Sequence, residues 1–166
     1  MMASRWHLID EHEIIWLIAD HQKQRRLCAD LERIADNLPD LPSVDAVRHI
    51  EARLAGYADR HLPQETELFR RLSADAVTPP AARILREIQH NHAVDAMHAD
   101  DLSVELRRLS GASRAVPAGE LAYMLRCFFD GCRRAMAYEE LALLNLGDDC
   151  LTPAAKNAVL LSFRTG

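Results

Sequence analysis

Apolar residues recur along this chain at intervals of three, four and seven positions, in four long stretches separated by turn-forming residues. This spacing places the apolar side chains of each stretch on one face of an α-helix. The breaks, where proline, glycine and serine cluster, are "NLPDLPS" (37–43), "SADAVTPP" (73–80) and "SGASRAVPAG" (110–119). The pattern predicts helices over roughly 4–37, 43–73, 79–110 and 117–147, and a short helix in "AAKNAVLLSF" that follows Thr152 and Pro153.

Four long amphipathic helices joined by short links predict an all-α fold, an up-down-up-down four-helix bundle with a short C-terminal helix. The chain has 166 residues, of which 49% are hydrophobic, which is enough for one core. We therefore expect a single domain over 1–166. Within the second helix Pro63 has no backbone N–H to donate, so a kink is expected between His61 and Glu65.

Composition narrows the classes of function. The formal net charge of −5 and the lack of a dense Lys/Arg run argue against a nucleic-acid partner. No apolar run approaches the roughly 20 residues of a membrane helix, so no membrane association is expected. The first residues, "MMASRWHLIDEHE", soon turn acidic and lack the apolar core of a secretory signal. We expect a cytoplasmic protein.

The four cysteines, Cys28, Cys127, Cys132 and Cys150, show no C-x-x-C spacing. Cys28 and Cys132 fall on apolar helix faces, where a reduced cysteine packs as a small hydrophobic residue. Reduced cysteines of the core are favoured over a disulfide framework or a zinc site.

Each predicted helix carries an ionisable residue on its apolar face, near its middle. A lone buried histidine is usually hydrogen-bonded packing, but burying five ionisable groups without compensation would cost several kcal/mol each. A cation at the bundle axis compensates them directly. Imidazole and carboxylate donors without thiolate favour iron, manganese or zinc. The five residues are His21, His61, Glu65, His92 and Glu139, and Asp95 lies on the same line as His92.

The remaining histidines are expected to play no part in this site. His12 and His90 are predicted to face solvent, and His98 flanks the apolar face of its helix, within reach of Asp95 or Asp101; His7 and His49 have no supporting context. The tetrapeptide "EIQH" (87–90) imitates the Glu-x-x-His motif of ferritin-type diiron proteins, but it occurs once and faces outward.

Four segments together resemble the hemerythrin-like, or HHE cation-binding, domain of bacterial type, over nearly the whole chain. They are "DHQKQRRLCADLERIADNLP", "RHLPQETELFRRL", "HAVDAMHADDL" and "RRAMAYEELALLNLGDDCLT". The resemblance implies a non-haem diiron centre inside a four-helix bundle. Carried over position by position, it implies the metal ligands His21, His61, Glu65, His92 and Glu139.

The chain departs from the family pattern at one expected ligand. The last helix of the family usually carries a histidine four residues before its glutamate, and here that position is Ala135; the family's proline is Asn145. The departure leaves open a diiron site, a mononuclear site or an empty one. Tyr57 and Tyr138 are placed either to approach the site or to pack.

The resemblance implies binding or sensing of a small diatomic ligand, such as dioxygen or nitric oxide, or the handling of iron, with zinc or manganese as alternative metals. A second hypothesis is a metal-poor interaction or scaffold protein, with a homodimer face near Trp6 and Trp16. A third is an enzyme that processes nitric oxide or peroxide. No hydrolytic triad and no phosphate-binding loop is recognisable, so binding is favoured over catalysis.

Overall fold

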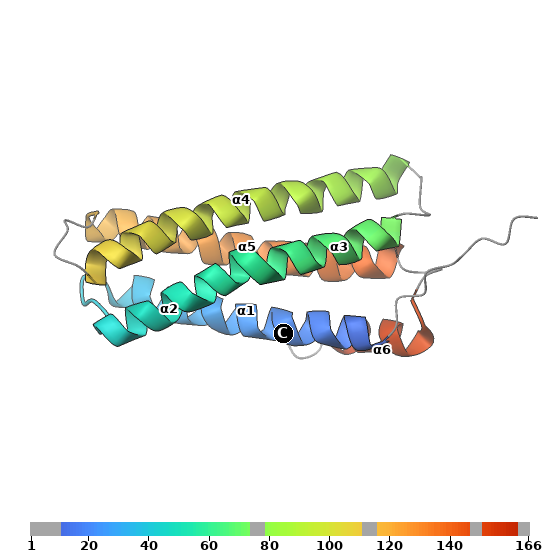
Figure 1. Ribbon diagram of the computed structural model, residues 1–166, viewed down its shortest axis with the longest axis horizontal. Helices are drawn as coiled ribbons and strands as arrows, with labels where there is room; N and C mark the ends of the chain where they lie inside the picture. Colours follow the sequence, from blue (N-terminus) through green and yellow to red (C-terminus); the bar gives the residue numbers. More distant parts are fainter. Residues whose placement is uncertain (1–10, 74–78, 111–115, 147–150, 163–166) are drawn as a thin grey trace, which may run out of the picture.

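The computed structural model describes residues 11–73, 79–110, 116–146 and 151–162. The predicted all-α fold is confirmed, and the helix boundaries lie close to those expected (Figure 1). The first predicted helix is described from Glu11 onward, and residues 4–10 lie outside the described part. The elements are α1 (Glu11–Asn37), α2 (Val44–Gly56), the π-helical turn η1 (Tyr57–His61), α3 (Leu62–Ser73), α4 (Pro79–Ser110), α5 (Ala118–Leu146) and α6 (Pro153–Ser162).

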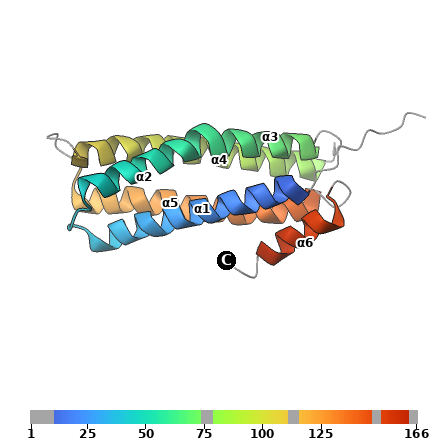
Figure 2. The same ribbon diagram turned by 60° about the horizontal axis from the view of Figure 1, so that its bottom comes forward.

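The long helices run alternately in opposite directions. The segments α2, η1 and α3 follow one another along one rod, so the bundle has four rods in chain order (Figure 1). Helix α5 packs against both α1 and α4, and α2 and α3 pack against α4. The short helix α6 folds back along the end of the bundle where α1 begins and contacts α1 and α5 (Figure 2).

Local sequence signals fix two of the helix starts. Ser43 is the N-cap of α2, where its hydroxyl accepts a hydrogen bond from the backbone N–H of Ala46 at 3.3 Å. Thr152 caps α6 in the same way through the N–H of Ala155 at 3.2 Å, and Pro153 occupies the first helical position. These are the turn residues that the sequence pattern selected as breaks.

The irregularity expected at Pro63 takes the form of a π-helical turn just before it. The backbone N–H of Leu62 bonds the carbonyl of Tyr57, five residues back, instead of the carbonyl four residues back. Pro63 donates no hydrogen bond and its ring would crowd the carbonyl of Asp59, so a widened turn here accommodates both effects. The π turn ends at His61 and thereby sets the direction in which this side chain leaves the helix.

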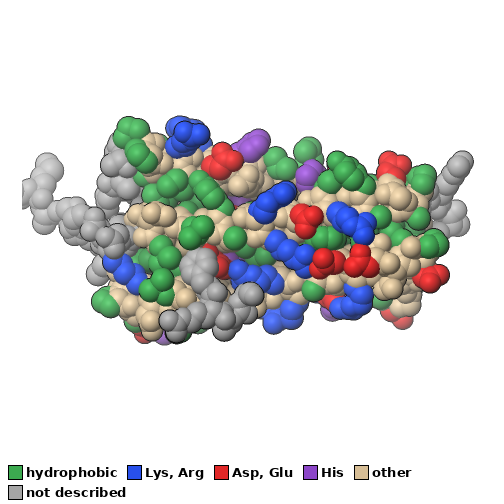
Figure 3. Space-filling model, turned by 180° about the vertical axis from the view of Figure 1, so that it is seen from behind, with side chains coloured by type: hydrophobic (Ala, Val, Ile, Leu, Met, Phe, Trp, Pro, Cys, Tyr) green, Lys and Arg blue, Asp and Glu red, His purple; other side chains and the backbone are tan. Residues whose placement is uncertain are grey.

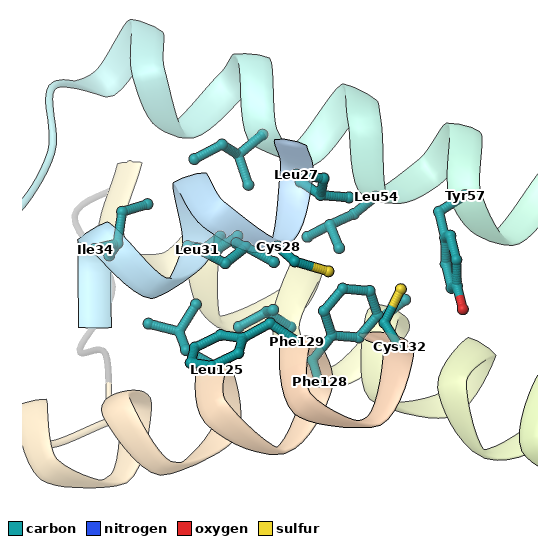
Figure 4. Close-up of a cluster of buried hydrophobic side chains, with 14 of the residues drawn as sticks. Leu27, Cys28, Leu31, Ile34, Leu54, Tyr57, Leu125, Phe128, Phe129 and Cys132 are labelled. Carbon is teal, nitrogen blue, oxygen red and sulfur yellow. The ribbon is translucent and has the colours of Figure 1, made fainter. Parts of the chain in front are cut away.

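Two apolar clusters fill the bundle on either side of its middle. The larger one joins α1, α2, α4 and α5 around Leu31, Leu54 and Phe128, with Cys28 and Cys132 inside it (Figure 4). The second occupies the end covered by α6. It includes Ile14, Leu17, Leu68, Phe69, Ile88, Leu143, Ala155 and Val159. A polar layer separates the two clusters, and it contains the residues considered next.

The surface carries charges of both signs. Lys and Arg side chains lie among Asp and Glu side chains along the middle of the face shown in Figure 3. Within the described residues, no helix is long and apolar enough to cross a membrane.

Candidate metal centre

The structure brings all five predicted residues to the same polar layer. His21 comes from the middle of α1, His61 ends the π turn, Glu65 lies in the first turn of α3, and His92 and Glu139 come from the middle of α4 and α5. Each of these residues is at most 5% exposed. The apolar faces of four helices therefore deliver three imidazoles and two carboxylates to one place in the core.

The two carboxylates lie between the histidines. His21 Nε2 is 2.9 Å from Glu65 Oε1 and 3.6 Å from Glu139 Oε2. His92 Nε2 is 2.9 Å from Glu139 Oε1 and 3.5 Å from Glu65 Oε2, and His61 Nε2 is 3.1 Å from Glu65 Oε2. Two sets of donor atoms that share Glu65 each fit within 4.8 Å, and either set could hold a metal ion: His21, His61 and Glu65, and Glu65, His92 and Glu139.

The outward nitrogen of each imidazole is fixed by a hydrogen bond. His21 Nδ1 lies 2.8 Å from Glu140 Oε1, and His61 Nδ1 lies 2.5 Å from Asp20 Oδ2. His92 Nδ1 is 2.8 Å from the hydroxyl of Thr66, which donates its own proton to a backbone carbonyl and so accepts from the imidazole. Every Nδ1 therefore carries a proton, and every Nε2 points to the carboxylates. Such outer partners orient the histidine ligands of metal sites.

The sequence reasoning missed these outer residues, although each one adjoins a predicted ligand. Asp20 precedes His21, Thr66 follows Glu65, and Glu140 follows Glu139. Adjacency is the signal that would have found them. Adjacency would not have shown which histidine each outer residue bonds, because that histidine always lies on another helix than the outer residue itself. Glu140 is 1% exposed and also accepts a 2.8 Å hydrogen bond from Arg25.

The enclosed charges shift the pKa values of the three histidines upward. Burial opposes the charge of each imidazole, but the neighbouring carboxylates outweigh burial. The negative charge of Glu65, and the hydrogen bonds that His21 makes to Glu140 and Glu65, raise the pKa of His21 to about 10. Asp20 and Glu65 raise the pKa of His61 to about 9, and Glu139 and Glu65 raise that of His92 to about 9. Without a metal, all three imidazoles are protonated at neutral pH.

The two carboxylates differ in their pKa values. Burial and then the negative charge of Glu65 raise the pKa of Glu139 to about 7, against the pull of His92 and His21. Burial opposes the charge of Glu65 as well, but the charge and the hydrogen bond of His21, together with the nearby imidazoles of His61 and His92, hold its pKa well below the ordinary value. Glu65 is thus the permanent anion of the pair.

A buried carboxylate oxygen without a hydrogen-bond partner shows that the donor set fits a metal ion. Glu65 Oε2 is fully buried and has no partner in hydrogen-bond geometry, although two imidazole nitrogens lie within 3.5 Å of it. A buried acceptor without a partner is unusual in a native core. Donors bound at 2.0–2.2 Å to one ion lie about 3.0–3.5 Å apart, which is close to the separations seen here. Exchange of the Nε2 protons for a cation would therefore require little movement.

The remaining candidates lie beside the site. Tyr57 stacks on His61 with ring centroids 5.1 Å apart and donates a 3.0 Å hydrogen bond to Asp95 Oδ2, so both Tyr57 and Asp95 belong to the wall between the polar layer and the larger apolar cluster. Ala135 is buried, and it lines a crevice on the outside of the site together with Tyr138. No atom of Asp95 belongs to the two donor sets found among the described residues.

The histidines assigned to the surface are found there where the structure describes them. His12, His49 and His90 are exposed, and His7 lies outside the described residues. His98 is half-buried, and its Nδ1 has no hydrogen-bond partner. The cysteines Cys28, Cys127 and Cys132 are free, as predicted, and Cys150 and Trp6 lie outside the described part.

Comparison with known proteins gives one match. The family model described as the hemerythrin HHE cation binding domain matches residues 12–146, which include all five predicted ligands and the whole bundle of long helices. No curated protein matches the chain, and no solved structure matches it.

Proposed function

The chain belongs to the hemerythrin HHE cation-binding family, and from this premise we propose that His21, His61, Glu65, His92 and Glu139 hold one or two non-haem iron ions. The observation that carries the proposal is the common orientation of the three imidazoles. Each has its Nδ1 tied to an outer acceptor and its Nε2 turned toward buried carboxylates. That arrangement is the one that neutral histidine ligands require.

The two halves of the site differ in ways that bear on the metal. The first set, His21, His61 and Glu65, is a two-histidine, one-carboxylate group, which suits non-haem Fe(II) and leaves positions open. The second set has His92 with Glu65 and Glu139, and Ala135 contributes no donor to it. We propose that the first half binds iron more tightly. Zinc and manganese accept the same nitrogen and oxygen donors and are the alternative metals.

The protein supplies apolar surroundings and compensating charge. The two apolar clusters flank the polar layer, and Glu65 and Glu139 offset the charge of a cation inside the core. Bound iron would supply reversible one-electron chemistry and an open position for a small ligand. We propose that the ligand is a diatomic molecule such as dioxygen or nitric oxide, and that the protein binds or senses it; storage or delivery of iron is the second use of the same site.

A metal-poor scaffold function is the alternative from another class, and one observation favours it. The three imidazoles and the two carboxylates already form a network of charged hydrogen bonds, with distances of 2.9 Å at His21–Glu65 and His92–Glu139. Such a network can persist without a metal when the histidines are protonated. Under this alternative, iron would neither bind in stoichiometric amount nor raise the melting temperature.

Metal analysis with one matched pair of variants separates the two proposals. Protein purified from iron-replete cells is measured for iron, zinc and manganese content, for its visible spectrum and for its melting temperature before and after chelation. His92→Ala is compared with His90→Ala, which removes an exposed imidazole two residues away on α4. We expect metal content and the metal-dependent rise in melting temperature to fall in His92→Ala and to remain in His90→Ala. Metal-free wild-type protein, with no rise in melting temperature on adding iron, would refute the metal proposal.

A further inference from the structure

The two halves of the centre are built on matching positions of the chain. Asp20 directly precedes His21 on α1, and Asn91 directly precedes His92 on α4. His61 stands four residues before Glu65, and Ala135 stands four residues before Glu139. The helix pair α4 and α5 therefore repeats the arrangement of α1 with η1 and α3. In the second half both the imidazole and the carboxylate that orients it are replaced, by alanine and asparagine.

Each half also has a surface crevice, and the crevices reach His61 in the first half and Ala135 in the second. The first, of about 680 Å³, is lined by Trp16, Asp20, Arg60, His61 and Gln64, among other residues, and His61 with Asp20 forms part of its wall. The second lies between α4 and α5, which run side by side in Figures 1 and 2. It has a volume of about 350 Å³. We call it the α4–α5 crevice.

The α4–α5 crevice is lined from the same positions of its helices as the first crevice, but only the arginine is kept. Glu87, Asn91, Arg134, Ala135 and Tyr138 stand at the positions of Trp16, Asp20, Arg60, His61 and Gln64. Where the first crevice meets an imidazole ring, this one meets only the methyl group of Ala135. The space that a histidine side chain would fill is thus continuous with a crevice that opens to solvent.

Polar side chains of Asp95 and His98 line the α4–α5 crevice. Asp95, which is 4% exposed, lines it, and its Oδ2 accepts the hydrogen bond from Tyr57, which leaves Oδ1 as its second acceptor atom. A Cβ atom built on Gly131 would lie 3.3 Å from this Oδ1, so a larger residue at 131 would press on it. His98 also lines the crevice, and its buried Nδ1 has no partner. These atoms can bond a guest molecule.

From these observations we infer that the α4–α5 crevice admits a small neutral ligand, no larger than an imidazole ring, to the Glu139–His92 half of the centre. This inference rests on the proposed function, since the guest would complete a metal site. The acceptor Asp95 Oδ1 favours a guest that carries an N–H or O–H group. Glu87 and Asp95 beside Arg134 give the lining charges of both signs, so a neutral guest is favoured over an anion. In the His21–His61 half, the imidazole of His61 stands at the position that Ala135 holds in the second half, so the protein already supplies the donor there.

Imidazole is the probe, and cobalt(II) is the reporter ion. Full-length protein loaded with cobalt is titrated with imidazole while its visible spectrum and its melting temperature are recorded. We expect a saturable spectral change in the wild-type protein. Two variants close the crevice at its base: Ala135→His restores a side-chain donor, and Ala135→Leu fills the space without one. Circular dichroism confirms that each variant is folded and cobalt analysis that it is loaded, and a loss of the imidazole response in both variants is expected.

The outcomes separate this inference from the proposed function. A saturable response in wild type that either folded, cobalt-loaded variant loses supports the inference. A response that persists in both variants places imidazole elsewhere and overturns it, and so does a cobalt-loaded wild-type protein with no response. If either variant does not fold, the other still decides between these results. Failure of the wild-type protein to bind cobalt or iron at all overturns the proposed function and, with it, the inference.

Discussion

Asp20 is a sensitive test of the metal proposal, because it lies outside the ligand set and reaches the site through its contact with His61. Its Oδ2 lies 2.5 Å from His61 Nδ1, and the side chain is 13% exposed. Replacement Asp20→Asn gives the first half of the site the residue that the second half has at Asn91. The change removes the charge of the acceptor and leaves an amide oxygen in its place.

The expected loss follows from the bond itself. A hydrogen bond to a charged group is worth about 1.5–3 kcal/mol, and about 1.4 kcal/mol corresponds to a factor of ten. Since outer-shell substitutions at metal sites also weaken binding about 10–100-fold, we expect the first metal ion to bind Asp20→Asn about tenfold more weakly, and Asp20→Ala closer to 100-fold. The fold and the second half of the site should be unchanged.

Competition with a chromophoric chelator measures this loss. Asp100→Asn, which makes the same charge change at an exposed position of α4, is the control and should bind metal as the wild type does. Circular dichroism and the melting temperature of the metal-free forms check that the variants are folded. Equal metal affinities of Asp20→Asn, Asp20→Ala and the control would mean that His61 is not a ligand, and the assignment of the first half would be wrong.

Three further predictions test the second half, the protonation state and the core. Ala135→His should add iron per chain, measured by elemental analysis, and the further change Asn91→Asp should tighten that second ion about 10–100-fold; unchanged metal content would mean that position 135 does not face the centre. Because pKa values of about 9 to 10 keep the three buried imidazoles protonated at pH 7, metal binding must release their Nε2 protons. The metal affinity measured by titration should therefore rise between pH 7 and 9, by about one decade per pH unit for each proton displaced. An affinity that does not change with pH would contradict this. Phe128→Ala should lower the free energy of unfolding by about 3–5 kcal/mol in denaturant titrations, because Phe128 is fully buried, whereas Tyr123→Ala at a 70% exposed position should change it by less than about 0.5 kcal/mol.

The sequence alone determined the helices and the identity of the polar residues in the core. Helical spacing of apolar residues and clusters of proline, glycine and serine mark where helices begin and end, and both are local properties of the chain. The same spacing places His21, His92 and Glu139 on apolar faces, because a residue seven positions from a buried one shares its face. Ala135 was also readable from the sequence, as a departure from the family pattern.

Only the tertiary structure decided which atoms meet. The partners of the outward imidazole nitrogens, Asp20, Thr66 and Glu140, each come from a different helix than the histidine they bond, so helix packing and rotation select them. Periodicity alone placed Asp95 in line with His92, but Tyr57 draws its carboxylate into a hydrogen bond away from the ligand set. The spacing of residues along the chain determines which helix face each side chain lies on, whereas the distances between side chains of different helices depend on how the four helices pack.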